Sequence, residues 1–442
     1  MSWLQEHPQV RAIRTAVADL NGQARGKRLP ARLADKVLAG EARMPLSVLN
    51  VDIWGDDIEG SPLVFETGDR DGILEPTGRG FVPMPWLETP TALLPMWMYR
   101  DDGSAFAGDP RHALAGVLAR YEARGWRPVA ATELEFYLVD DSGASLHPPP
   151  SPWSGKRGLG GDMLSIRALD AFDDFFSALY DACEAMGIPA EAAISESGMG
   201  QYEINLTHGP AMRAADDTWL FKLLAHGLAR KHGFAASFMA KPYPEHAGNG
   251  LHMHFSVIDR DGVNIFDDGS ETGSDKLHAA IAGCLDAMGD SALVFAPHGN
   301  SYDRLVPGAH APTAISWAYE NRTAAIRVPS GSAKARRIEH RVAGGDINPY
   351  LFMATVLGAA LIGIEDKLTP PEPVTGNAYA MNLPRIAPDW GVAIDRFENS
   401  GLMKRILPRE LVRNYTATKR QELLYYAELT DAERLELYLD TV

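Results

Sequence analysis

The segment Thr132–Leu138 places the tightest constraint on how this chain can fold. It alternates acidic and apolar residues, and in a β-strand alternate side chains point to the same face. Glu133 and Glu135 therefore share one face, while the leucines and phenylalanine between and after them pack into the opposite layer. Two carboxylates this close on a partly buried strand repel each other unless a positive charge lies between them. The segment predicts a buried strand whose acidic face binds a divalent cation.

The same two-residue spacing recurs further along the chain. His252 and His254 flank a methionine, and Glu339 precedes Arg341 by two positions. Two more acids, Glu196 and Glu203, lie on either side of a Gly/Ser-rich turn. Each pair alone is more typical of a solvated face or a structural histidine. Five carboxylates and a His-x-His pair together favour at least two sites for a hard cation such as Mg²⁺ or Mn²⁺, which prefers oxygen ligands and accepts an occasional imidazole.

A basic segment interrupts the acidic background of the chain. Between positions 304 and 341 there are six arginines and one lysine, namely Arg304, Arg322, Arg327, Lys334, Arg336, Arg337 and Arg341. The guanidinium group matches carboxylate and phosphate oxygens, so the segment predicts a polyanionic ligand held beside the metals. The alternative is a surface network of ion pairs. The sequence contains neither a P-loop nor a Rossmann glycine fingerprint, so metals and arginines must bind any nucleotide.

Overall charge and cysteine content narrow the class of protein. The formal net charge of -16 argues against a nucleic-acid or anionic-membrane partner, since both need a basic surface. Cys183 and Cys284 are far apart, lack metal or redox spacing, and are expected to be reduced core residues within helices. No apolar stretch reaches the ~20 residues of a membrane helix. We therefore expect a soluble, cytoplasmic protein.

The pattern of strands, helices and turns predicts an α+β protein with two domains, 1–102 and 103–442. Before the boundary, strand-and-turn segments include 14–20, the turn Asn21–Gly22 and a strand over 49–54, with a short helix near 30–38. After the boundary, strands alternate with helices predicted at 110–124, 169–186, 211–232, 276–288 and 349–368. A long loop rich in Pro, Ser and Gly, 143–161, is either a mobile flap over a site or a tolerated insertion.

Nearly the whole chain resembles the glutamine synthetase superfamily. The motifs are Glu133-x-Glu135, Gly200-Gln-x-Glu203, Gly248-x-Gly-x-His-x-His254, Asn300–Gly308, Asn321-Arg322, Lys334–Arg341 and Asn348-Pro-Tyr350. Within the superfamily, Asp19–Gly22, Phe238–Tyr243 and Arg341–Gly344 are most similar to the γ-glutamylpolyamine (glutamate–putrescine) ligases of amine catabolism. The resemblance implies an N-terminal β-grasp domain, a catalytic domain with a curved antiparallel sheet, and a dodecamer of two stacked hexamers. In such an assembly, the leucines alternating along Leu435–Leu439 are a plausible clasp between rings.

The resemblance also implies a role for each candidate site residue. Metal ligands would be Glu135, Glu196 and Glu203 for the ion beside glutamate, and Glu133, His252 and Glu339 for the ion on the ATP phosphates. Glutamate would be bound by Arg304, Arg341 and the backbone near Gly248, and the nucleotide by His254, Ser256, Lys334 and Arg337. Arg322 and Arg327 would stabilise phosphate charge during phosphoryl transfer. The implied reaction joins the glutamate side-chain carboxylate to an amine through an acyl phosphate, without a protein nucleophile.

Two departures from ammonia-using glutamine synthetases fall at the ammonium pocket. Their flap glutamate is replaced by His310 within Pro307–Pro312, and their ammonium-site loop by Val51–Gly55. An imidazole near pKa ~6.5 is able to accept a proton from an alkylammonium ion, so His310 is a candidate base or a space-filling residue that admits a longer amine. These departures favour an organic amine as the nucleophile. The alternatives are an ordinary glutamine synthetase, a catalytically idle regulatory ring protein and a two-metal hydrolase.

Overall fold

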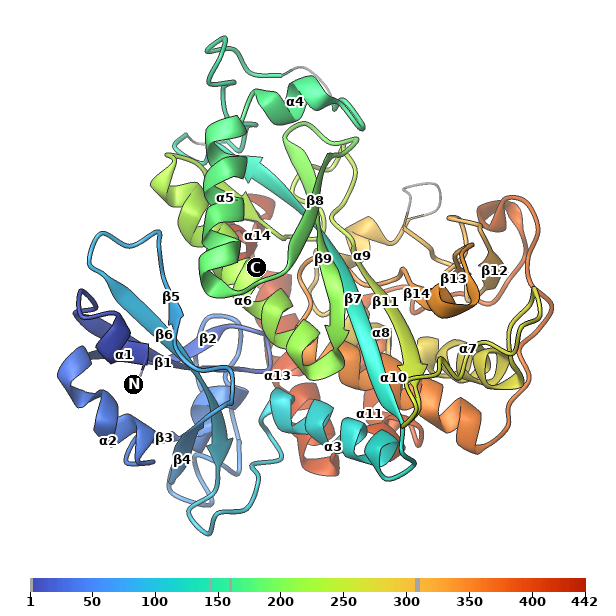
Figure 1. Ribbon diagram of the computed structural model, residues 1–442, viewed down its shortest axis with the longest axis horizontal. Helices are drawn as coiled ribbons and strands as arrows, with labels where there is room; N and C mark the ends of the chain where they lie inside the picture. Colours follow the sequence, from blue (N-terminus) through green and yellow to red (C-terminus); the bar gives the residue numbers. More distant parts are fainter. Residues whose placement is uncertain (1–2, 144, 159–160, 307–310) are drawn as a thin grey trace.

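Two β-sheets and the helices packed on them make up the protein in this computed structural model, which describes residues 3–143, 145–158, 161–306 and 311–442 (Figure 1). The N-terminal part, blue in Figure 1, contains α1 (Trp3–Glu6), α2 (Ala34–Leu38), β1 (Ala12–Ala18), β2 (Ala24–Pro30), β3 (Arg43–Pro45), β4 (Asp71–Pro76), β5 (Val82–Pro83) and β6 (Thr91–Tyr99). Its sheet has the order β2-β1-β6-β4-β3, with β5 also paired to β6. The central pair β1 and β6 is parallel and the other pairs are antiparallel, in a small α+β unit as expected.

In the N-terminal part, local side-chain hydrogen bonds explain why the predicted turn at Asn21–Gly22 is correct and the predicted strand over 49–54 is wrong. The carboxylate of Asp19 accepts hydrogen bonds from the backbone N–H groups of Asn21 and Gln23, and Gly22 takes a φ of 81°, so the predicted turn is confirmed. The strand predicted over 49–54 is wrong. Its first residues belong to a 3₁₀ helix, Leu46–Asn50, and the carboxylate of Asp52 then accepts N–H groups two and four residues ahead, which curls the backbone into a turn.

The second sheet forms the scaffold of the larger part. It contains β7 (Arg127–Val139), β8 (Ala190–Ser195), β9 (Gln201–Pro210), β10 (Ala235–Ser237), β11 (Leu251–Ile258), β12 (Trp317–Tyr319), β13 (Ile326–Val328) and β14 (Ile338–His340). The order is β12-β13-β14-β11-β7-β9-β8, with β10 paired to one end of β7. All of these pairs are antiparallel except β12 with β13. The α+β class is confirmed, and the second sheet is antiparallel as expected, apart from the pair β12 and β13.

Strand β7 lies between β9 and β11 and shows the predicted alternation. Leu134, Phe136 and Leu138 are fully buried, whereas Glu133 and Glu135 are only partly covered. The apolar face of the sheet packs on α6, and β7 also contacts α3. The acidic face is therefore left free to line a site.

Helices of the larger part are α3 (Pro110–Glu122), α4 (Ile166–Asp170), α5 (Asp173–Met186), α6 (Ala211–Lys231), α7 (Asp275–Met288), α8 (Ala292–Phe295), α9 (Ser301–Arg304), α10 (Pro349–Glu365), α11 (Trp390–Asn399), α12 (Met403–Ile406), α13 (Arg409–Glu428) and α14 (Asp431–Thr441). Helix α10 is almost entirely buried and packs against α3, α6 and α7. Cys183 in α5 and Cys284 in α7 are buried free thiols, as predicted. Among the described helices, none combines the length and apolarity that a membrane crossing needs.

One helical prediction needs correction. The helix predicted over 169–186 is interrupted, because α4 ends before Phe172 and α5 begins at the acidic pair that follows, where carboxylates interact favourably with a helix N-terminus. The alternation along Leu435–Leu439 belongs to helix α14, not to an extended segment. Tyr438 of this helix packs on Ile53 and Met239 of its own chain. The role of this segment as a clasp between rings stays a prediction.

Two of the hydrophobic clusters among the described residues, one large and one small, lie on either side of the N-terminal sheet. Ile13, Leu74, Leu94 and Met98 belong to the small region, which lies wholly before residue 107. Leu20, on the other side, belongs to the large core beneath β7 and α10. Both regions use residues of β1 and β6, so the N-terminal sheet shares its second face with the larger part.

Candidate active site

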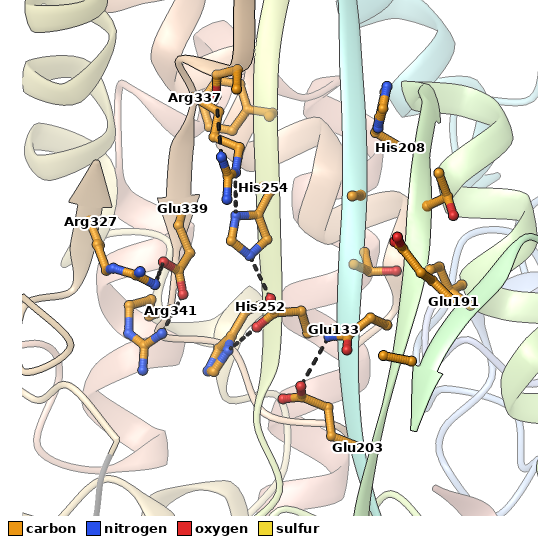
Figure 2. A pocket seen from close by; sticks show the side chains of 18 of the residues that line it. Glu133, Glu191, Glu203, His208, His252, His254, Arg327, Arg337, Glu339 and Arg341 are labelled. Atoms are coloured by element: carbon orange, nitrogen blue, oxygen red, sulfur yellow. Dashed lines mark hydrogen bonds and ion pairs between the residues drawn. The ribbon is translucent and has the colours of Figure 1, made fainter. Parts of the chain in front are cut away.

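Strand register brings the predicted functional residues into one row across the second sheet. Glu203 on β9 lies opposite Glu135 on β7, and Glu133 lies opposite His252 on β11. On the other side of β11, His254 pairs with Glu339 on β14, which in turn pairs with Arg327 on β13. Side chains directly opposite each other in a sheet have Cβ atoms only ~5 Å apart. Five strands thus place acids, imidazoles and a guanidinium side by side (Figure 2).

This row forms part of the wall of a cavity of about 1360 Å³. Fifteen of the sixteen predicted site residues line it: Glu133, Glu135, Glu196, Glu203, Gly248, His252, His254, Ser256, Arg304, Arg322, Arg327, Lys334, Arg337, Glu339 and Arg341. The sixteenth, His310, lies outside the described residues. Residues from six of the seven motifs therefore meet in one place, although their individual roles stay predictions.

The sequence analysis missed several residues that line the same cavity. Glu191 on β8 and His208 on β9 lie beside β7, on the opposite side from β11 (Figure 2). Met163 and Leu164 reach the cavity from the long loop before α4. A single acid, a single histidine and two apolar residues in a loop carry no spacing signal, so only the three-dimensional arrangement reveals them.

Glu133 is the centre of a hydrogen-bonded set that includes both histidines and indicates the tautomer of His254. Its carboxylate lies 3.0 Å from Nδ1 of His252 and 2.9 Å from Nε2 of His254. The guanidinium of Arg337 donates from Nε to Nδ1 of His254 at 3.2 Å. Because arginine is always a donor, His254 must accept at Nδ1 and carry its proton on Nε2. Both nitrogens of His254 are thus used, whereas His252 is hydrogen-bonded only through Nδ1 among the described residues, so its Nε2 is available to a cation.

Several carboxylates lie close together in this row, and their mutual repulsion changes their pKa values. Burial, with the charges of Glu133 and Glu135, raises the pKa of the Glu203 carboxyl to about 9. Burial and the neighbouring Glu135 likewise raise the pKa of Glu196 to about 7. Burial also raises the pKa of Glu133, but the hydrogen bonds from its two histidines outweigh that effect and lower its pKa. A divalent cation would stabilise the ionised form of every carboxylate in this row.

The donor atoms present fit such a cation. Ligand atoms of Glu133, Glu203 and His252 lie within 4.8 Å of one another, as do those of Glu133, His254 and Glu339. The predicted set of Glu203 with Glu135 and Glu196 is not one of these groups of described residues, and it stays a prediction. Since His254 has no free lone pair, we favour His252 as the imidazole ligand. Oxygen donors with one imidazole suit Mg²⁺ or Mn²⁺.

Glu135 is oriented by backbone and amide groups that the sequence analysis did not assign to it. The carboxylate accepts a hydrogen bond from the N–H of Gly250 at 2.7 Å and a longer one, 3.4 Å, from the side chain of Gln201. The same Gln201 amide donates to the carbonyl of Gly248 and to Asn249. The loop between β10 and β11 is thereby tied to the acidic face of β7.

Three buried arginines lie at one end of the row. Arg327 donates to Glu339 at 2.6 Å, and Arg341 pairs with the other oxygen of the same carboxylate. Arg304 donates to the carbonyl of Val342 at 2.8 Å and packs so closely on Gly248 that a Cβ there would meet its side chain at 2.8 Å. The glycine is required for this close approach. Positive charge is therefore concentrated next to the carboxylates, where an anionic ligand would be stabilised.

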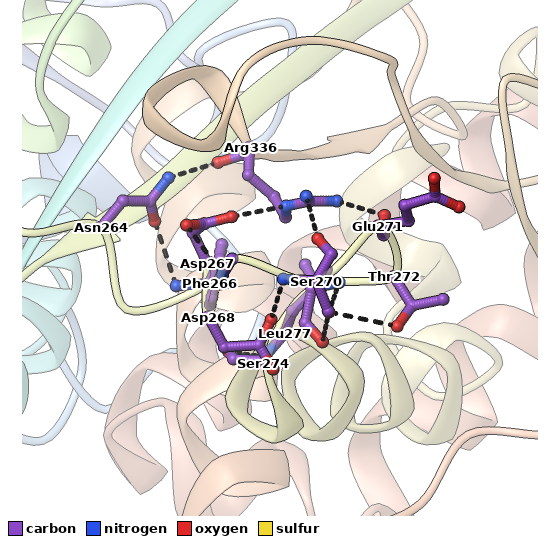
Figure 3. Close-up of polar contacts among 12 residues, drawn as sticks. Asn264, Phe266, Asp267, Asp268, Ser270, Glu271, Thr272, Ser274, Leu277 and Arg336 are labelled. Atoms are coloured by element: carbon purple, nitrogen blue, oxygen red, sulfur yellow. Dashed lines mark hydrogen bonds and ion pairs between the residues drawn. The ribbon is translucent and has the colours of Figure 1, made fainter.

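Arg336 differs from the other arginines of the basic segment because it does not line the main cavity. Its polar contacts are with the loop before α7 (Figure 3). Its guanidinium donates to Asp267 and to the carbonyls of Ser270 and Glu271, while its own carbonyl accepts from Asn264. The prediction that the whole basic segment binds a ligand is wrong for this residue. Arg336 instead fastens the loop before α7 to the segment that carries Lys334 and Arg337.

Comparison with known proteins agrees with this geometry. Residues 107–438 match the family described as "Glutamine synthetase, catalytic domain". The chain is 35% identical to γ-glutamylputrescine synthetase PuuA of Escherichia coli K12, over 99% of this chain and 93% of that protein. It is 33% identical to γ-glutamylethanolamide synthetase GlnA4 of Streptomyces coelicolor (95% and 90% covered) and 30% identical to glutamate–isopropylamine ligase of a Pseudomonas species (100% and 97% covered).

Solved structures give the same answer for the fold. A "novel glutamine synthase homolog" superposes with a TM-score of 0.85 at 25% identity, covering 98% of this chain and 99% of that one. A structure titled "GmaS/ADP complex-Conformation 1" also gives a TM-score of 0.85 at 25% identity, over 98% and 97% of the two chains. The family match covers the β7 row, the basic segment and the cavity between them. The chain therefore belongs to the glutamine synthetase family and is a ligase of that family.

Proposed function

We propose that this enzyme uses ATP to join the side-chain carboxylate of glutamate to an organic amine. The observation that carries the proposal is the single cavity in which the carboxylate–histidine cluster around Glu133 adjoins the arginines around Glu339. A cation site next to a concentration of guanidinium groups suits the transfer of a phosphoryl group between two anions.

Each end of the cavity would bind one substrate. Arg304 and Arg341, with the close-packed backbone at Gly248, would bind glutamate. Ser256, His254, Lys334 and Arg337 line the part of the cavity beyond Glu133 and would contact the nucleotide. The two substrates would then approach each other across the acidic row, with Arg322 and Arg327 facing the transferred phosphate.

The reaction would proceed in two steps. An oxygen of the glutamate γ-carboxylate attacks the terminal phosphorus of ATP, which releases ADP and leaves γ-glutamyl phosphate. The neutral amine then attacks the γ-carbonyl carbon, inorganic phosphate leaves and the nitrogen loses a proton. Bound cations would neutralise phosphate charge. Arg327 is already held next to Glu339, so its guanidinium needs little reorganisation to stabilise charge that develops on the phosphate.

The acceptor is proposed to be an organic amine. Support comes from the names of the three relatives above and from the loss of both ammonium-pocket motifs in the sequence. An ordinary glutamine synthetase is the second candidate, since a protein named glutamine synthetase from Clostridium saccharobutylicum is 32% identical over 98% of this chain. The family resemblance also supports a dodecameric assembly.

Amine specificity tests the proposal. Phosphate release in the presence of ATP and glutamate should depend on added amine, and kcat/KM for the best organic amine should exceed that for ammonium by at least roughly tenfold. Mass spectrometry should detect the matching γ-glutamyl amide. Equal efficiency with ammonium and with every organic amine would support glutamine synthetase instead, and phosphate release with no amine requirement would support a hydrolase.

A second prediction concerns Arg336. Alanine at this position removes three donors that hold the loop before α7 against Lys334 and Arg337, so the KM for ATP should rise by roughly tenfold while kcat changes less. Lysine at this position places a single ammonium group where arginine has three donor nitrogens, so Arg336→Lys should reverse only part of the rise in the KM for ATP. Arg405→Ala is the control, because Arg405 forms an exposed ion pair with Asp366. Equal effects on kcat and KM in Arg336→Ala would contradict a role in positioning the nucleotide end.

A further inference from the structure

We infer that Met163 and Leu164 form an apolar wall that binds the aliphatic carbons of the acceptor amine. The inference rests on the proposed function and goes beyond it by assigning the acceptor subsite to residues in the loop before α4. Both side chains line the main cavity. Neither belongs to the motifs that carry the family resemblance.

Hydrogen bonds place these two residues next to the acidic row. The N–H of Leu164 donates to the carbonyl of Ser195 at 2.8 Å. The Ser195 hydroxyl accepts from the N–H of Ser165 at 2.7 Å and donates to the carbonyl of Asp162 at 2.6 Å. Residues 162–165 are therefore attached at three points to the end of β8, one residue before Glu196.

The backbone of this segment is held in a conformation that leucine rarely adopts. Leu164 has a φ of 58°, in the left-handed region, which costs a bulky residue of order 1 kcal/mol or more. Gly161 approaches Ser197 so closely that a Cβ would meet the Ser197 carbonyl oxygen at 1.7 Å. The chain is thus pressed against the end of β8, with a strained leucine at its centre. Strain of this kind is commonly retained at ligand sites.

Both side chains are largely exposed within the described chain. Met163 is 55% exposed and Leu164 is 69% exposed, so neither contributes much to the core. Burial in the hydrophobic core therefore does not compensate for the strain at Leu164. An apolar ligand in the cavity would cover both side chains.

The chemistry next to them fits an alkylamine. The carboxylate of Glu196, the residue that follows Ser195, would attract an ammonium group as the amine enters. Ile194, Ala247 and Ala311 also line this cavity and add small apolar surfaces. The ammonium group of an amine would therefore lie near a negative charge, and its carbon chain would pack against an apolar surface. Ammonium has no carbon to bury and gains nothing from the wall.

A homologous series of amines tests the wall. With ATP and glutamate saturating, kcat/KM for methylamine, ethylamine, propylamine and butylamine should rise with chain length in the wild-type enzyme, by up to about fourfold for each methylene that becomes fully buried. In the double variant Met163→Gln/Leu164→Asn, the factor by which kcat/KM increases for each added methylene should be less than about half of the wild-type factor. The value of kcat/KM for ammonium should change by less than about twofold. Asparagine tolerates a positive φ, so the backbone should be retained.

Ile166→Asn is the matched control. Ile166 lies two residues further on and is 68% exposed, but it does not line the cavity. In the Ile166→Asn variant, kcat/KM should rise with amine chain length as steeply as in the wild-type enzyme. The inference would be overturned if the double variant kept the wild-type dependence of kcat/KM on chain length, or if Ile166→Asn lost that dependence to the same extent. Either result would leave the proposed function intact. A wild-type enzyme that releases phosphate with no amine at all would overturn the proposed function and the wall with it.

Discussion

Removal of divalent cations is expected to abolish ATP turnover by this ligase. The carboxylates of Glu133 and Glu203 converge with His252, and those of Glu133 and Glu339 converge with His254. Burial and the charges of neighbouring carboxylates raise the pKa of the Glu203 carboxyl to about 9. Without a cation these acids cannot all be ionised together, and phosphate oxygens would add to the repulsion. Excess EDTA should therefore reduce phosphate release to background, and Mg²⁺ or Mn²⁺ should restore it.

Substitution of one acid should give a comparable loss. Glu135→Gln is expected to lower kcat by roughly a hundredfold or more and to weaken cation binding measured by calorimetry. The melting temperature should not fall, because the amide keeps the shape of the side chain and relieves repulsion within the row. Glu191→Gln is the matched control, since Glu191 lines the same cavity but is not among the predicted metal ligands, whereas Glu135 is.

These measurements separate a metal role from a structural one. Full activity in excess EDTA, or equal effects of Glu135→Gln and Glu191→Gln, would contradict the cation sites. A Glu135→Gln variant that binds cation normally but loses activity would instead place Glu135 in orientation of the substrate. Its hydrogen bonds to Gly250 and Gln201 make such a role structurally reasonable.

Loss of Lys419 is expected to destabilise the protein more than loss of an exposed charge. Lys419 on α13 is fully buried, donates to Glu422 at 2.7 Å and donates to Asn21 of the β1–β2 turn at 2.5 Å. Asn21 donates in turn to the other oxygen of Glu422 at 2.9 Å. Lys419→Met would leave the Glu422 carboxylate buried without its cation, at a cost of about 3–5 kcal/mol. For a chain of this length the melting temperature should fall by roughly 3–5 °C, measured calorimetrically.

Two controls test this interpretation. Arg420→Met removes the neighbouring residue, whose ion pairs with Asp395 and Glu398 are exposed, so the melting temperature should change by only about 1 °C or less. The double variant Lys419→Met/Glu422→Met removes both buried charges and should recover much of the loss. If Lys419→Met is no worse than Arg420→Met, the buried pair does not stabilise the contact between the N-terminal turn and α13.

Local chemistry explains which helices the sequence predicts well. Helices α3 and α10 begin where expected because Asp109 and Asn348 accept backbone N–H groups at the N-cap and a proline follows each of them. Helix α5 ends where Gly187 takes a φ of 65°. The strand predicted over 49–54 is wrong because the side chain of Asp52 bonds the backbone ahead of it, which periodicity does not reveal.

In the candidate site, too, some features follow from the sequence alone and others depend on the tertiary structure. Alternation along β7 is a property of the strand itself, so the sequence alone determines that Glu133 and Glu135 share a face, and the motifs identify the arginines and histidines that accompany them. Which residues meet across strands depends on register, because a slip of one residue would turn every side chain to the other face. Register is set by packing of the whole sheet on its helices, and it pairs Glu133 with His252 and His254 with Glu339.

Tertiary structure alone decided the direction of individual side chains. Arg336 and Arg337 are neighbours in the basic segment, yet Arg337 faces the cavity and Arg336 holds the loop before α7, because each guanidinium points to the acceptors within its reach. Met163 and Leu164 reach the cavity only because Ser195, some thirty residues away in the chain, accepts and donates the hydrogen bonds that bend their backbone. Sequence determines the periodic and capping patterns, which are local, whereas contacts between distant segments depend on the packing of the whole chain.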